Sequence, residues 1–137
     1  MAEIYVARSS SACKWGASVG LTKHIYKVGV AEDSAHAAVK ALNQSQYGAE
    51  ADWKLLKRED AAGVDEATAI ERLSKKEKMV DPALYPKIKG ARGIFKVKPV
   101  NAENYLIAKM AMENNIVAQF KLTPADIATY LINNALR

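Results

Sequence analysis

The chain has 137 residues and a net charge of +5; half of its residues are hydrophobic and 26% are charged. This length suits one domain, and the composition excludes a disordered or collagen-like protein. The single cysteine, Cys13, excludes an internal disulfide and a metal site built from several cysteines of this chain.

The positive charge is concentrated in one segment. Residues 72–98 contain nine lysines and arginines but only two acids, so the rest of the chain is slightly acidic. Such a cluster favours polyanions, and an equally ordinary interpretation is a solvated face. The nine are Arg72, Lys75, Lys76, Lys78, Lys87, Lys89, Arg92, Lys96 and Lys98, of which the first seven are the candidate nucleic-acid-binding residues.

Hydrophobic runs are too short to cross a bilayer. No stretch approaches eighteen uninterrupted apolar residues, and residues 1–5 lack the basic start of a signal peptide. We therefore expect no membrane partner and a cytoplasmic location, which also suits a chain with one cysteine.

The first third of the chain predicts two strands and a helix. Residues 4–7 form a short apolar and aromatic run typical of a strand, and residues 24–30 alternate apolar and polar side chains. Because they follow one another closely, we expect the two to pair antiparallel. Residues 9–22 are rich in small side chains and predict a loop. A helix capped by Asp33 or Ser34 should follow, to about residue 43.

The middle of the chain predicts a further strand and helix. Residues 51–58 are a candidate strand, and Asp65 is a plausible cap for a helix that reaches roughly Lys78. Pro82 and Pro86 interrupt both helix and strand, so a loop should follow. The predicted buried side chains of this helix are Ala69, Ile70 and Leu73.

The last part of the chain predicts two strands and two helices. Residues 93–99 alternate as a strand does, Asn101 could cap a helix through Met112, and residues 116–122 resemble another strand. The final helix has a strong start at Thr123, which is followed by a proline and an acid.

Together these elements predict an α+β fold, in which helices flank a small, mixed, mainly antiparallel sheet. We expect a domain over residues 1–100 and a C-terminal helix-strand-helix extension over residues 101–137, packed on the same domain. The final helix is apolar on more than one stripe, which favours a docking or dimer surface, although a buried core helix would show the same pattern.

No common nucleophile or metal motif is present. The serines at 9–11 precede no nucleophile elbow, and His24 and His36 lack metal-ligand spacing. Gly16 and Gly20 are not followed by the lysine and hydroxyl residue of a phosphate loop.

The order of short motifs in the first hundred residues is more specific. Residues 4–5 (Ile-Tyr) precede residues 27–29 (Lys-Val-Gly), then a capped helix, and later the aromatic strand at residues 93–97. This pattern resembles the GIY-YIG nuclease superfamily, especially the branch whose second motif reads Lys-Ile-Gly. The resemblance covers about residues 3–98.

The resemblance implies metal-dependent hydrolysis of a phosphodiester in DNA or RNA. Tyr5, Tyr26 and Lys27 would position or activate water, and Glu71 or Glu66 would hold Mg²⁺ or another divalent ion. The candidate catalytic residues are therefore Tyr5, Tyr26, Lys27 and Glu71, and the candidate metal ligands are Glu71 and Glu66.

The chain departs from the family pattern at two positions. Position 3 is glutamate where the family has glycine, and Ala38 stands where the family usually carries an arginine. The sequence therefore predicts a nucleic-acid-binding domain with weak or absent cleavage, and leaves it uncertain whether the chain is an endonuclease. The alternative is a protein-interaction module that docks on a partner or forms a homodimer through its C-terminal extension.

Overall fold

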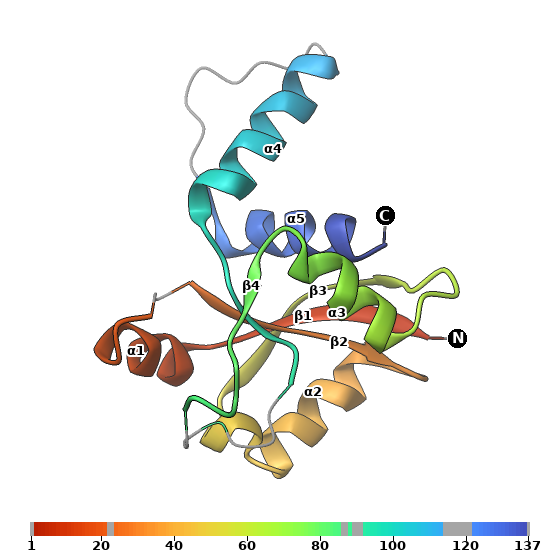
Figure 1. Ribbon diagram of the computed structural model, residues 1–137. Coiled ribbons are helices and arrows are strands. Elements are labelled where there is room, and N and C mark those ends of the chain that lie inside the picture. The colour runs from red at the N-terminus through yellow and green to blue at the C-terminus, as the bar shows by residue number, and fades with distance from the viewer. Residues whose placement is uncertain (1, 22–23, 86–87, 89–91, 114–121, 137) are drawn as a thin grey trace.

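The computed structural model describes the chain except for residues 1, 22–23, 86–87, 89–91, 114–121 and 137. It has an α+β fold, as predicted: an antiparallel sheet in the order β3-β1-β2-β5-β4, with helices on both faces (Figure 1). The strands are β1 (Glu3–Ser9), β2 (Ile25–Ala31), β3 (Trp53–Asp60), β4 (Lys78–Met79) and β5 (Ile94–Lys96). The helices are α1 (Ser10–Ser18), α2 (Ala35–Gln44), the 3₁₀ turn η1 (Tyr47–Ala49), α3 (Glu66–Ser74), α4 (Pro99–Met112) and α5 (Pro124–Leu136).

Both faces of the sheet are covered. Successive residues of a strand point to opposite faces, so β1 sends Ile4 and Val6 into the core under α3 and α5. The residues that alternate with them, Tyr5 and Ala7, lie in the core under α1 and α2. This division decides which side chains of β1 and β2 can meet.

Helix α1 contradicts the loop predicted for residues 9–22. Ser9 caps the helix by accepting a hydrogen bond from Ala12 N at 3.0 Å, and Asp52 accepts from Ser11 N at 3.0 Å and from the hydroxyl of Ser9. The small side chains of Ala12 and Cys13 are buried against the sheet. A short helix of weak propensity is therefore stabilised by tertiary contacts.

Three predicted helix starts are confirmed. Ser34, Asp65 and Thr123 each accept a hydrogen bond from the backbone N–H three residues ahead, at 3.4, 2.7 and 3.2 Å. These side chains satisfy N–H groups that have no partner within the helix. The predicted buried stripe of α3 is also confirmed.

Two helix boundaries were predicted wrongly. Helix α3 ends at Ser74, because Lys78 joins the sheet as part of β4. Helix α4 begins at Pro99, and Asn101 does not cap it, because its side-chain amide donates to Glu77 Oε2 at 2.8 Å. The strand predicted at residues 116–122 lies, apart from Leu122, outside the described residues.

The two C-terminal helices differ in burial. Helix α5 packs on α3 and on the sheet, so its apolar stripes belong to the core. Helix α4 projects away from the sheet in Figure 1, and Ala102 is its one buried residue. Its exposed large apolar side chains are Val100, Ile107 and Met112. In the described part of the chain, no helix has the length and apolarity that a bilayer crossing requires.

Candidate functional site

Tyr5 and Glu66 converge above Gly29. Tyr5 is the direct partner of Gly29 across the β1–β2 ladder. A Cβ atom added at Gly29 would lie 2.6 Å from the Tyr5 hydroxyl oxygen and 3.0 Å from Glu66 Oε1. The hydroxyl and the carboxylate oxygen are therefore no further apart than the sum of these distances, and the absence of a side chain at Gly29 makes room for both.

Glu66 is hydrogen-bonded directly to the backbone of β2. Among the described residues, β5 pairs with β2 at residues 25–27, and further along β2 Glu66 Oε1 accepts a hydrogen bond from Val30 N at 3.1 Å. Asp65 caps α3 and so places Glu66 at the first helical position. The side chain of Glu66 is exposed, so it is accessible to a ligand.

Lys27 is a buried cation next to this pair. Its side chain is only 4% exposed, and its Nζ donates to the carbonyl of Arg92 at 2.7 Å and lies 4.8 Å from the centre of the Tyr47 ring. The Tyr47 hydroxyl donates to the same carbonyl at 2.5 Å and accepts from Arg92 N. Sequence reasoning missed Tyr47 and the backbone role of Arg92, because no local pattern links η1 to the loop before β5.

The electrostatics keep the tyrosine protonated. Burial raises the pKa of Tyr5, and the negative charge of Glu66 raises it further. Burial lowers the pKa of Lys27, while the Glu66 carboxylate opposes that change. The three side chains therefore provide a neutral phenol and an exposed carboxylate beside a buried amine, a set that can donate to phosphate oxygen or orient water.

The carboxylate of Glu66 fits a weak, open metal site. Mg²⁺ is commonly held by one or two carboxylates, with water and substrate phosphate as the other ligands. One oxygen of Glu66 is bonded to Val30 N, so the other is the natural ligand. Among the described residues, no group of three or more His, Cys, Asp or Glu side chains could hold a metal ion. An ion at Glu66 would therefore need water or substrate for most of its ligands.

Two of the predicted catalytic residues lie elsewhere. Tyr26 points to the opposite face of the sheet, into the core under α3 and α5, where burial raises its pKa to about 12. Glu71 is exposed on α3 five residues after Glu66, about 140° further round the helix. Of the two candidate metal ligands, Glu66 is the one that the structure brings to Tyr5.

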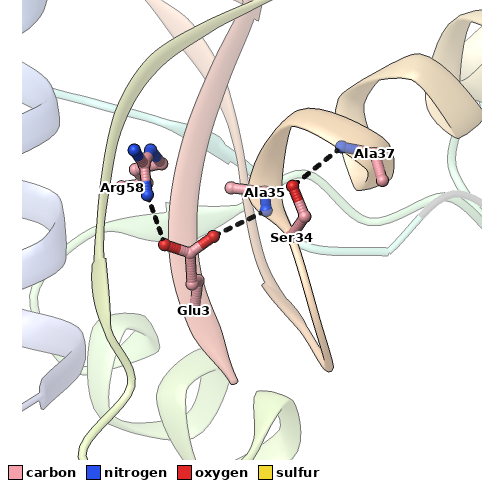
Figure 2. Close-up of polar contacts among 5 residues, drawn as sticks. All are labelled: Glu3, Ser34, Ala35, Ala37 and Arg58. Atoms are coloured by element: carbon pink, nitrogen blue, oxygen red, sulfur yellow. Dashed lines mark hydrogen bonds and ion pairs between the residues drawn. The ribbon is translucent and has the colours of Figure 1, made fainter. Parts of the chain in front are cut away.

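Position 3, where the family pattern has glycine, has a structural role. Glu3 Oε1 accepts from Ala35 N at 2.9 Å, and its Oε2 pairs with Arg58 Nη1 at 2.6 Å (Figure 2). The carboxylate thus joins β1, β3 and the start of α2. The bond from Ala35 N, followed by that from Arg58, lowers the pKa of Glu3. At the arginine position of the family, Ala38 packs half-buried against the core.

Most of the described cations of the basic segment gather in one hollow. It has a volume of about 880 Å³ and lies between the end of α3, the β4–β5 pair and the start of α4. The lysines that line it are Lys75, Lys76, Lys78, Lys96 and Lys98.

The remaining cations are placed differently. Arg72 Nη1 donates to the carbonyl of Leu136 at 3.0 Å and so holds the end of α5. The backbone of Arg92 contacts Lys27 and Tyr47, as described above. Lys87 and Lys89 lie outside the described residues.

No family model, curated protein or solved structure matches this chain.

Proposed function

We propose that this chain is a nucleic-acid-binding domain similar to the GIY-YIG nucleases, with weak or absent metal-dependent cleavage at the Tyr5–Glu66 pair beside Gly29. The observation that carries the proposal is the convergence of Tyr5, Lys27 and Glu66 from two strands and a helix. A hydroxyl donor, a buried cation and an exposed carboxylate close to one another are suited to a phosphodiester group.

Each residue would have a distinct part. Tyr5 would donate its hydroxyl hydrogen to a phosphate oxygen or to a water molecule. Lys27 would contribute positive potential at short range, because its Nζ is already bonded to the Arg92 carbonyl. A divalent ion bound at Glu66 would supply charge neutralisation. Helix α2 offers no arginine for the developing charge, which is why we expect little or no cleavage.

Two glutamates of α3 give a matched test. Glu66→Gln and Glu71→Gln remove the same charge from exposed positions of one helix, but of the two only Glu66 lies beside Tyr5 and Gly29. We would measure binding and cleavage of single-stranded and duplex DNA and RNA with Mg²⁺ or Mn²⁺. Glu66→Gln should lower any cleavage, and any metal-dependent gain in affinity, by about tenfold or more, whereas Glu71→Gln should match the wild type.

Two results would contradict the proposal. One is a wild-type protein that binds no nucleic acid in a salt-dependent way. The other is an equal effect of the two substitutions, which would place the metal or phosphate away from Gly29.

The exposed apolar surface of α4 favours a second candidate function, a protein-interaction module. The apolar residues of the final helix are buried, so homodimer formation would use α4 and its exposed Val100, Ile107 and Met112. Light scattering over a range of concentrations should then show a dimer that Ile107→Lys dissociates. A monomer at every concentration would exclude the homodimer.

A further inference from the structure

Among the described residues, the lysines of the hollow form no ion pair with an acid. The ion pair found in that part of the chain joins Arg58 to Glu3, on a different part of the surface. The acid among the described residues that line the hollow is Glu77, which is only 4% exposed and accepts hydrogen bonds from Lys98 N, Asn101 Nδ2 and the Tyr130 hydroxyl at 2.7–2.8 Å. Because its oxygens are occupied by these internal donors, no described carboxylate of the hollow is available to pair with the five lysines.

Two of these lysines are opposed directly. Lys78 and Lys96 are cross-strand partners in the β4–β5 ladder, and like charges in that position destabilise a sheet. Lysine on an edge strand is often explained as protection against strand pairing. That explanation fits Lys78, on the edge strand β4, but not Lys96, because β5 lies between β2 and β4. An anionic group bound between the two side chains would account for both.

The hollow also has an apolar lining. Met79, Val97 and Val100 contribute to it together with Leu21. The volume of about 880 Å³ is within the range of ordinary ligand pockets, roughly 300–1,000 Å³. The surface therefore suits a ligand that carries several phosphates and an unstacked apolar ring, since the phosphates need the lysines and the ring needs the apolar side chains.

We propose that this hollow binds a segment of single-stranded nucleic acid, with phosphates on the lysines and a base against the apolar lining. The inference rests on the proposed function and names its substrate class. A duplex can offer phosphates to the lysines, but its bases are stacked inside the helix. A single strand offers both phosphates and base faces.

The hollow and the Tyr5–Glu66 pair lie along the same strand. Lys96 pairs with Ile25 across the β2–β5 ladder, and Gly29 lies four residues further along β2, about 13 Å from Ile25 at the usual rise of a strand. Lys96 also points to the same face of the sheet as Lys27, because Ile94, two residues earlier on β5, is the partner of Lys27.

The test compares two triple variants that remove equal charge. Lys75→Gln, Lys78→Gln and Lys96→Gln together alter the hollow. The control changes three exposed lysines on other elements, namely Lys40, Lys54 and Lys109, to glutamine. The probes are an oligothymidylate and a duplex of equal length, with affinity measured by fluorescence anisotropy over a range of salt concentrations, and folding checked by circular dichroism.

We expect the wild type to bind the single strand more tightly than the duplex. The hollow variant should lose single-strand affinity by about tenfold or more, and the slope of log affinity against log salt should become shallower by about 2. The control should change much less. Equal losses in the two variants, or equal affinity for duplex and single strand, would overturn the inference while nucleic-acid binding stands. Absence of salt-dependent binding by the wild type would instead reject the proposed function itself.

Discussion

Lys78 and Lys96 face each other as direct partners across the β4–β5 ladder, and both line the hollow at that edge of the sheet. Because like charges in this arrangement repel, Lys96→Gln should raise the free energy of unfolding by about 0.5 kcal/mol at low salt. Urea titration should show the gain shrinking as added salt screens the pair.

Lys109→Gln on α4 provides the control, because it removes a lysine that lies outside the hollow. It should leave stability nearly unchanged. A loss of stability in Lys96→Gln would mean that the Lys96 side chain makes a favourable contact that outweighs the repulsion. A residue that weakens the free protein yet strengthens nucleic-acid binding is typical of a binding site.

The hydrogen bond between Tyr130 and Glu77 joins α5 to the segment between α3 and β4. The Tyr130 hydroxyl donates to Glu77 Oε2 at 2.7 Å in a buried position. Tyr130→Phe should lower the free energy of unfolding by about 2 kcal/mol, because a hydrogen bond to a buried carboxylate is lost. Urea or thermal unfolding measures this change.

Tyr105→Phe is the matched control, since the Tyr105 ring packs 5.6 Å from that of Tyr130 but is only half-buried. It should cost well under half as much as Tyr130→Phe. Equal effects of the two substitutions would show that the bond to Glu77 contributes no more to stability than the half-exposed hydroxyl of Tyr105.

The predictable parts of the fold depend on local signals. The caps at Ser34, Asp65 and Thr123 could be predicted, because each side chain acts on a backbone N–H three residues away. Helix α1 could not, because its start depends on Asp52, which lies more than forty positions from Ser9 and Ser11. The small side chains that suggested a loop are instead those that allow α1 to lie close to the sheet.

The candidate site was predictable only in part, for the same reason. Tyr5 and Lys27 lie in strands with recognisable motifs, and simple alternation places Tyr26 on the opposite face from Lys27. The choice between Glu66 and Glu71 needed the long-range hydrogen bond from Val30 N to Glu66, which no local pattern indicates. Strand β5 is also shorter than the alternating run at residues 93–99 indicated.

Gly93 should be the least replaceable glycine near Lys27. It has a φ of +81°, and a Cβ there would lie 2.6 Å from the carbonyl oxygen of Val28 and 2.9 Å from Lys27 Nζ. Gly93→Ala should therefore combine backbone strain with a steric clash and lower the free energy of unfolding by about 3 kcal/mol. Thermal or urea unfolding would measure it.

Gly63→Ala separates the two contributions. Gly63 has the same φ of +81°, but apart from its chain neighbours no described residue has an atom within 4 Å of the position of its Cβ. We expect it to cost about 1 kcal/mol, from strain alone. If both substitutions cost the same, the close approach of Gly93 to β2 contributes nothing to stability.

The bonds of Glu3 should make stability depend on pH at the acid end. The pKa of Glu3 is lowered in the folded protein by Ala35 N and then by Arg58, so the folded state binds this proton less readily than the unfolded state does. The contribution of Glu3 is therefore fully present above the unfolded pKa, roughly 4.3, and is lost as the pH falls through the lower folded value. Glu3→Gln should be less stable than the wild type at neutral pH and should approach it in acid.

Unfolding by urea across this pH range measures the difference, with Glu59→Gln on the exposed end of β3 as the control. A constant difference between Glu3→Gln and the wild type at every pH would show that the carboxylate charge does not stabilise the junction of β1, β3 and α2.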